Sequence, residues 1–184
     1  MRTLLLLVAV VACSDTQEPA VQRPRVRGEG EPRRVAIERI LISYRGNPFE
    51  IPARRTLEEA QRVARQVLRR AQAGENFVAL RDGYSDDREP GAQTANGPYF
   101  FCNYGIDPDP TRPQVPRMLR ANMGRRLGDA AFKMQQGEIA LIEYDAQDYS
   151  AGFEVIRLIV RDDRTEEQVE RDLSGARRTS DGGR

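Results

Sequence analysis

The chain has 184 residues, of which 39% are hydrophobic and 31% charged, and these proportions allow one domain of ordinary size with a strongly solvated surface. The formal net charge is only +1 and the basic residues are spread along the chain, which argues against nucleic acid as a partner because phosphate binding needs a concentrated basic face. The sequence contains no histidine and only two widely separated cysteines, so neither a zinc site nor another metal centre is expected.

The first apolar segment predicts export. Residues 4–12 form an unbroken apolar run, which is too short to cross a bilayer and is typical of a signal peptide. The run ends in VVAC at 10–13, which resembles the lipobox of bacterial lipoproteins and implies that Cys13 carries the lipid. In that pattern Ser14 implies the outer membrane, facing the periplasm. The alternatives are a plain secretory signal cleaved nearby and a cysteine that stands here by chance.

Four regions follow from the distribution of apolar residues. Residues 1–12 are the expected signal peptide. Residues 13–34 mix Pro, Gly, Arg, Glu and Gln without a hydrophobic period, which predicts a lipidated, solvated tether. The folded domain is expected over 35–162, where aliphatic residues return, and 163–184 is expected to be a polar tail.

The domain is predicted to begin with a strand at 35–43, which is rich in Ile, Leu and Val. Thr56 then predicts the start of a helix, because Glu59 stands at the capping-box position and apolar residues recur at helical spacing as far as Gly74. A second, short helix is expected at about 76–83.

The second half of the domain is predicted to contain a helix near 125–134 and strands at 139–144 and 153–160, joined by a hairpin connection. Residues 100–122 contain several prolines and are expected to form an inserted loop. A stiff surface loop is the simpler interpretation, and a loop lying across the substrate pocket is the alternative. The order of elements predicts an α+β fold, a small antiparallel sheet with helices packed on it.

Four segments resemble the parvulin-type peptidyl-prolyl isomerases, in order and in spacing. They are ILIS at 40–43, GENFVAL with YSDD at 74–87, AAFKMQQGEI at 130–139 and GFEVI at 152–156. The resemblance implies the parvulin fold and the cis–trans isomerisation of peptide bonds that precede proline. Unfolded or folding polypeptides with Xaa-Pro bonds are then the implied partners. The reaction is a rotation about the amide bond, so no cofactor or metal is implied.

The resemblance also implies a site. Met123 and Leu127 match the methionine and aromatic positions of the proline pocket, although leucine replaces the usual phenylalanine. Phe132 is included with the substrate-binding residues as a core residue that supports this pocket, and Asn96 falls near another pocket position in a segment that aligns poorly. Asp87 matches the position where parvulins carry Asp or Cys beside the substrate amide.

Both histidines of the family are replaced, by Arg39 before the first strand's ILIS and by Glu154 in GFEVI. In the resembling fold these positions face each other on neighbouring strands, so we expect a partly buried ion pair that takes the place of the histidine hydrogen bond. The alternative is that both side chains turn to solvent. Arg39, Glu154 and Asp87 are the expected catalytic residues.

The function expected from these observations is a prolyl isomerase that assists the folding of exported or envelope proteins. Two alternatives remain, and the loss of both histidines favours the first of them. One is a catalytically weakened binding module, a chaperone that holds proline-containing clients. The other is a lipoprotein subunit of a secretion or envelope machine.

Overall fold

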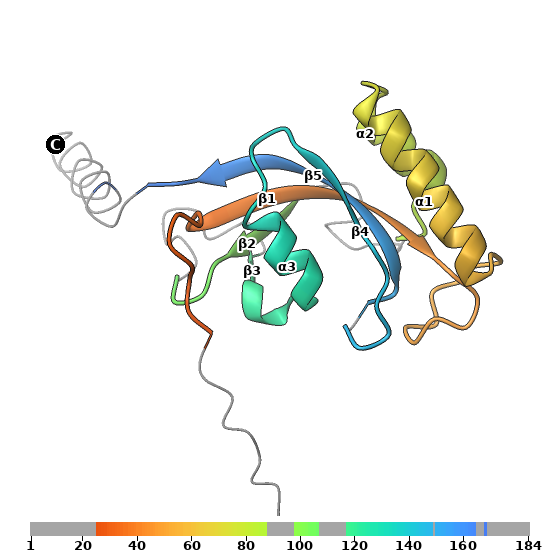
Figure 1. Cartoon of the computed structure of the whole chain (residues 1–184), viewed down its shortest axis with the longest axis horizontal. Coiled ribbons are helices and arrows are strands. Elements are labelled where there is room, and N and C mark those ends of the chain that lie inside the picture. Colours follow the sequence, from red (N-terminus) through yellow and green to blue (C-terminus); the bar gives the residue numbers. More distant parts are fainter. Residues whose placement is uncertain (1–24, 88–97, 107–116, 149, 165–167, 169–184) are drawn as a thin grey trace, which may run out of the picture.

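A five-stranded sheet forms the centre of the computed structural model, which describes residues 25–87, 98–106, 117–148, 150–164 and 168 (Figure 1). The strand order is β3-β2-β1-β5-β4. The strands are β1 (Arg34–Ser43), β2 (Tyr99–Cys102), β3 (Arg117–Leu119), β4 (Ile139–Ile142) and β5 (Gly152–Asp162). The two long strands, β1 and β5, pair antiparallel over their whole length and are therefore the frame on which the shorter elements are placed.

The α+β class is confirmed, but the sheet is mixed rather than purely antiparallel. Strands β2 and β3 lie largely within 100–122, where the sequence predicted only an inserted loop, and they pair with each other in parallel. They have four and three residues and stand beside prolines, so neither shows an alternating pattern long enough to predict a strand. Pairing with the edge of β1 stabilises β2, and this pairing is a tertiary interaction.

The two helices between β1 and β2 begin where the sequence predicted. Helix α1 (Leu57–Gln72) starts with the expected capping box, in which Glu59 N donates to Thr56 Oγ1 at 3.2 Å and Thr56 N donates to Glu59 Oε2 at 2.8 Å. Gly74 has a φ of 90° just after the helix, a conformation that favours glycine. Helix α2 (Phe77–Tyr84) follows, with Asn76 as its N-cap.

Helix α3 (Arg125–Ala131) is shorter than the expected helix near 125–134, and a short 3₁₀ turn, η1 (Arg120–Asn122), precedes it. The helix ends early because the chain turns back toward the sheet, where Gly137 N donates to the carbonyl of Leu158 at 2.7 Å. The predicted strands at 139–144 and 153–160 are confirmed as β4 and β5, with shifted ends, and they pair as a hairpin.

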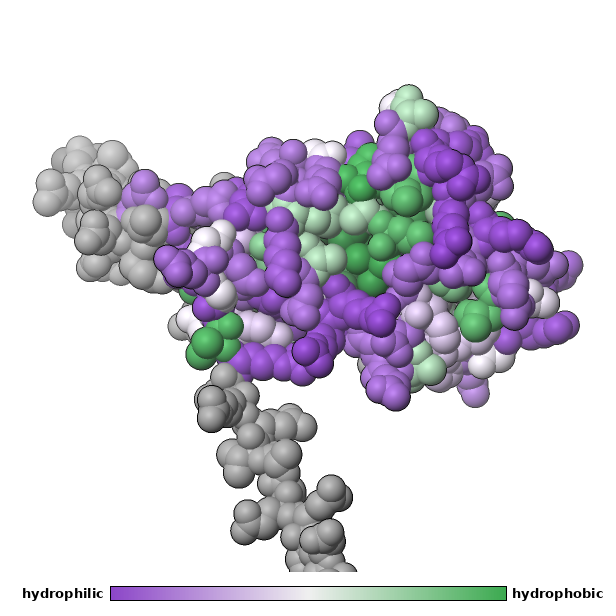
Figure 2. Space-filling model, viewed as in Figure 1, coloured by the Kyte–Doolittle hydropathy of each residue, from purple (hydrophilic) through white to green (hydrophobic). Residues whose placement is uncertain are grey.

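The sheet separates two hydrophobic clusters. Helices α1 and α2 cover one face, where Val67 and Phe77 pack with Ile40 of β1 (Figure 1). Helix α3 lies against the other face, where Leu127 packs with Ile37. Side chains alternate between the two faces along a strand. Seen from the side of Figure 1, most of the surface is hydrophilic, and hydrophobic residues show mainly between the sheet and α1 (Figure 2).

The folded domain begins earlier than the boundary expected at residue 35. Glu31 accepts hydrogen bonds from Arg120 at 2.6 Å and from Asn103 at 3.2 Å, so the end of the segment 13–34 packs on the domain. The expected signal peptide 1–12, the expected lipidation site Cys13 and nearly all of the expected tail 163–184 lie outside the described residues. Within the described part of the chain, every helix is too short or too polar to span a membrane.

We expect Asp162→Asn to weaken the domain near neutral pH and to make its stability less sensitive to acid. Asp162 accepts hydrogen bonds from Arg164 at 2.8 Å and from Arg34, its partner across β1 and β5, at 3.2 Å. Hydrogen bonds from Arg164 lower the pKa of Asp162 to about 2, against the opposing effect of burial. The lowered pKa stabilises the folded state above the pKa of the unfolded chain, and this stabilisation is lost as the pH falls from about 4 to about 2.

The measurement is urea unfolding at about pH 7 and about pH 3. The substitution should cost about 1–2 kcal/mol at the higher pH and about half of that at the lower pH. Asp163→Asn, at a more exposed neighbouring carboxylate, is the matched control. An equal cost of Asp162→Asn at both pH values contradicts the prediction.

Candidate functional site

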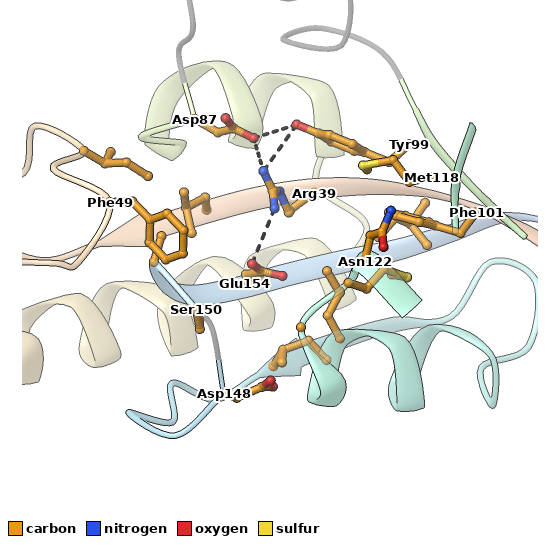
Figure 3. A pocket seen from close by; sticks show the side chains of 18 of the residues that line it. Arg39, Phe49, Asp87, Tyr99, Phe101, Met118, Asn122, Asp148, Ser150 and Glu154 are labelled. Atoms are coloured by element: carbon orange, nitrogen blue, oxygen red, sulfur yellow. Dashed lines mark hydrogen bonds and ion pairs between the residues drawn. The ribbon is translucent and has the colours of Figure 1, made fainter. Parts of the chain in front are cut away.

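A cavity of about 450 Å³ lies on the sheet face that carries α3 (Figure 3). Strands β1 and β5 form its base, and β2, β3, α3 and the connection from β4 to β5 surround it. Its lining divides into an apolar part near α3 and β3 and a polar part around Arg39. The cavity brings together five of the expected site residues, namely Arg39, Asp87, Met123, Leu127 and Glu154.

The apolar part of the cavity is formed around Met123 and Leu127, the two residues that the resemblance assigned to the proline pocket. Phe101 of β2 and Met118 of β3 complete this part, and Met118 is 40% exposed. A proline ring is apolar and small, so a cup of this composition and size can bury it.

A buried arginine positions the segment that carries Met123. Arg120 donates hydrogen bonds to Glu31, to Asn103 Oδ1 at 2.9 Å and to Asp129 at 2.9 Å, and its guanidinium lies 4.7 Å from the ring centre of Phe132. Gly128 allows the close approach of α3 to this side chain, because a Cβ there would lie 3.3 Å from Arg120 Cγ. The packing therefore fixes α3 and the turn before it against the cavity.

The polar part is a network centred on Arg39, which extends from β1 between two carboxylates (Figure 3). Nη2 of Arg39 donates to Asp87 Oδ2 in a close contact, and Nη1 donates to Glu154 Oε1 at 3.5 Å. The hydroxyl of Tyr99 donates to the same Asp87 oxygen at 2.6 Å, and the Arg39 guanidinium lies 4.8 Å from the centre of the Tyr99 ring. Asp87 is therefore held by a cation and a hydroxyl, whereas Glu154 has one long contact.

The two carboxyl groups differ in their proton affinity. Burial alone would raise the pKa of Asp87, but the charge of Arg39 and the hydrogen bonds from Tyr99 and Arg39 outweigh it, so the pKa is lowered. Burial raises the pKa of Glu154, and the charge of Asp87 raises it further, while Arg39 opposes both. Asp87 is thus the carboxylate that stays ionised.

The expected Arg39–Glu154 pair is present, but it belongs to a larger network. Arg39 stands opposite Ile156 and Glu154 opposite Leu41, so the two residues are diagonal neighbours across β1 and β5, and their long side chains meet. Their side chains are 22% and 10% exposed, so the alternative in which both turn to solvent is wrong. The nearer partner of Arg39 is Asp87, which the sequence did not connect with the pair.

One expected substrate-binding residue, Phe132, does not line the cavity. Phe132 is fully buried beneath it, in the cluster with Leu127 and Ile37, because α3 ends there and the side chain turns into the core. It packs in the core beside the pocket residue Leu127, and its part in substrate binding stays a prediction. Asn96 lies outside the described residues.

Sequence reasoning missed several lining residues. Tyr99 and Met118 stand on β2 and β3, and Phe49 and Ile51 stand on the connection between β1 and α1. The run of three aromatic residues at 99–101 was a signal for a strand, but nothing in the sequence connected Tyr99 with Asp87 or Arg39.

Asp86, the neighbour of Asp87, has a structural role. Its Oδ2 accepts from Ser43 N at 2.8 Å and also from Arg55, so it fixes the end of β1 beside the cavity. Among the described residues there is no cluster of three or more acidic or cysteine side chains that could hold a metal ion.

Residues 25–158 match the family model of the PPIC-type PPIASE domain. No curated protein matches the chain. Among solved structures, the crystal structure of PrsA from Bacillus subtilis aligns with a TM-score of 0.42 and 16% identity, over 78% of this chain and 41% of that one. The chain thus covers less than half of PrsA. Because the family model spans more than half of the chain, we conclude that the chain belongs to the family of PPIC-type peptidyl-prolyl isomerases, the parvulins.

Proposed function

We propose that this domain isomerises Xaa-Pro bonds of exported polypeptides, with the proline ring in the apolar part of the cavity and the amide beside the Arg39 network. One observation carries the proposal: Met123, Leu127 and Asp87, from different elements, line a single cavity of about 450 Å³. Membership in the parvulin family supports prolyl isomerisation as the reaction, and the cavity is the proposed place where the substrate binds.

The residues of the cavity fit the demands of the reaction. Rotation about the peptide bond is opposed by amide resonance, with a barrier of about 18–20 kcal/mol, and resonance places negative charge on the carbonyl oxygen. Twisting the bond removes this charge. Arg39 keeps the Asp87 carboxylate ionised. When this carboxylate lies beside the substrate's carbonyl oxygen, it destabilises the planar amide and so lowers the free-energy barrier to the twisted form. The apolar walls exclude water, which strengthens this effect.

Shortening the apolar wall should lower the rate of isomerisation without unfolding the domain. We expect Met123→Ala to reduce kcat/KM about tenfold, because Met123 forms part of the apolar wall proposed to hold the proline ring in the transition state. A protease-coupled assay on Xaa-Pro peptides measures this effect. Val78→Ala is the matched control, since Val78 is 39% exposed on α2, on the opposite side of the sheet.

Asp87→Ala in the same assay tests the polar part of the cavity and is expected to lower the rate as well. Peptide binding without any rate enhancement by the unsubstituted domain would support the binding-module alternative, which the replacement of both histidines keeps open. Equal activity of Met123→Ala and the unsubstituted domain would contradict the proposed site.

The cellular setting is part of the proposal. The VVAC run at 10–13 supports lipid attachment at Cys13, and Ser14 after it supports a place on the outer membrane, with the segment that follows as tether. Expression of the full chain in a bacterium with labelled palmitate tests this directly. Label should enter the full chain and be absent from Cys13→Ala, and label that persists in the variant rejects the anchor.

A further inference from the structure

The segment that leads into β1 is held to the domain by a carboxylate. Oε2 of Glu31 accepts a hydrogen bond from Gly28 N at 3.0 Å, which closes a turn in the segment. The same oxygen accepts from Asn103 Nδ2 at 3.2 Å and from Arg120 Nη1 at 2.6 Å. Asn103 Nδ2 also donates to the carbonyl of Pro32 at 2.9 Å. Side chains of the domain therefore fix this segment, although its sequence has no hydrophobic period.

Arg120 is the partner that connects Glu31 with α3. Its side chain is buried, and it also donates to Asp129 of α3 at 2.9 Å. The side chain of Glu31 is 13% exposed, whereas that of Asp129 is 45% exposed. Glu31 is thus the more buried of the two carboxylates that neutralise Arg120. Removing it is costly, because the guanidinium would remain desolvated without its nearer countercharge.

Arg120 and Met123 are joined through the backbone and through a common neighbour. Met123 N donates to the carbonyl of Arg120 at 3.1 Å, which closes the turn η1. A Cβ on Gly128 would lie 3.3 Å from Arg120 Cγ and 3.8 Å from Met123 Cβ, so both side chains pack against the same point of α3. In a closely packed interior a displaced side chain shifts its neighbours. The place of Arg120 therefore affects the place of Met123 in the cavity wall.

A second cavity, of about 330 Å³, offers Arg120 another position. Arg120 and Glu31 both line it. With Glu31 present, the guanidinium is held by this carboxylate and lies 4.7 Å from the ring centre of Phe132. Without Glu31, we expect the guanidinium to turn into the second cavity, where water can solvate its charge. Its stem would then leave Gly128, and the wall that includes Met123 would lose support.

We propose that Glu31 is a positioning residue of the isomerase site, and that it acts through Arg120 to hold Met123 in the apolar wall. Glu31 is not among the described residues that line the substrate cavity, so its effect is indirect. The segment before β1 is then a working part of the site as well as a connection to it. The proposal rests on the proposed function of the cavity.

The first test compares kcat/KM on an Xaa-Pro peptide for variants of the full chain. Glu31→Ala should lower kcat/KM about fivefold, because a displaced wall residue binds the transition state less well. In the Met123→Ala background the same substitution should change kcat/KM by less than about twofold, since the side chain that Glu31 positions is already removed. A purely structural role would give the same loss in both backgrounds.

The matched control is Glu29→Ala, because Glu29 is an exposed carboxylate of the same segment. It should leave kcat/KM unchanged. Glu31→Gln is the conservative variant: it keeps an oxygen that can accept from Arg120 and loses only the charge. Its kcat/KM should lie between those of Glu31→Ala and the unsubstituted chain. Thermal unfolding of each variant confirms folding.

The methionine methyl groups give a second readout, which needs no activity. The chain has four methionines, and the nuclear magnetic resonance signal of Met123 is identified by its loss in Met123→Ala. With isotope-labelled methyl groups, Glu31→Ala should shift or broaden this signal, and Glu29→Ala should not. Glu31→Gln should shift it less than Glu31→Ala. If Glu31→Ala does not fold, the shift in Glu31→Gln decides the question.

Three results overturn the proposal. One is a folded Glu31 variant in which the Met123 methyl signal stays in place. Another is a shifted signal with unchanged kcat/KM. The third is an equal loss of kcat/KM from Glu31→Ala in the unsubstituted and Met123→Ala backgrounds. A chain without activity on any Xaa-Pro peptide removes the proposed function instead, and the methyl signal still decides whether Glu31 holds Met123 in place.

Discussion

Gly152→Ala is expected to lower the free energy of unfolding by about 3 kcal/mol, near the upper end for an overpacked site. Gly152 opens β5 opposite Ser43, and a Cβ at this position would lie 2.3 Å from the carbonyl oxygen of Ile42 and 2.9 Å from Cα of Ser43. Both neighbours are backbone atoms in the central pair of strands. They cannot move aside as the end of a flexible side chain can, so the strands must shift apart.

The shift should also reach the cavity. Gly152 lies between Ser150 and Glu154, both of which line it. We therefore expect Gly152→Ala to lower kcat/KM as well as stability. Gly83→Ala is the matched control, because Gly83 lies in α2 and a Cβ there would meet nothing within 4 Å. The control should be neutral or slightly stabilising, as alanine favours the helix. Urea unfolding checks both, and an equal effect of the two substitutions contradicts the prediction.

Arg39→Met is expected to cost about 3 kcal/mol of stability and most of the activity. The substitution removes the cation that Asp87 contacts closely and leaves this half-buried carboxylate with the hydroxyl of Tyr99 alone. Removing one partner of a buried pair is expensive because the other charge stays desolvated. Without the charge of Arg39 the pKa of Asp87 rises, so the polar part of the cavity loses negative charge as well as the cation.

Double-mutant cycles separate the two partners of Arg39. We expect a coupling energy of about 2 kcal/mol between Arg39→Met and Asp87→Asn, and less than about 1 kcal/mol between Arg39→Met and Glu154→Gln. The difference follows from the geometry, since Arg39 contacts Asp87 closely and lies 3.5 Å from Glu154. Coupling to Glu154 that equals or exceeds coupling to Asp87 would show that the histidine positions form the dominant pair, as the sequence suggested.

Replacement of the two family histidines by Arg39 and Glu154 changes the chemistry of the site but not the pairing of the two strands that carry them. Arg39 and Glu154 stand on β1 and β5, whose pairing depends on the alternation of Ile, Leu and Val and not on the residues exchanged. In this chain Arg39 lies between Asp87 and Glu154, at the site where the family carries two histidine side chains.

The sequence by itself determined the elements that depend on near neighbours. The capping box of Thr56 and Glu59, the apolar face of α1 and the two long strands are local patterns, and each is confirmed. Through the resemblance to the parvulins it also assigned Met123, Leu127 and Asp87 to one site, and all three line one cavity.

Only the tertiary structure decided the rest. Strands β2 and β3 are too short to be stable alone, and they form because β2 pairs with the edge of β1 and β3 pairs with β2. Their local sequence is therefore not sufficient to predict them. The same pairing carries Tyr99 to Asp87 and Arg39, from positions 12 and 60 residues away along the chain. The charge state of a buried carboxyl depends on what surrounds it in space, and for that reason the contrast between Asp87 and Glu154 appears only in the folded chain.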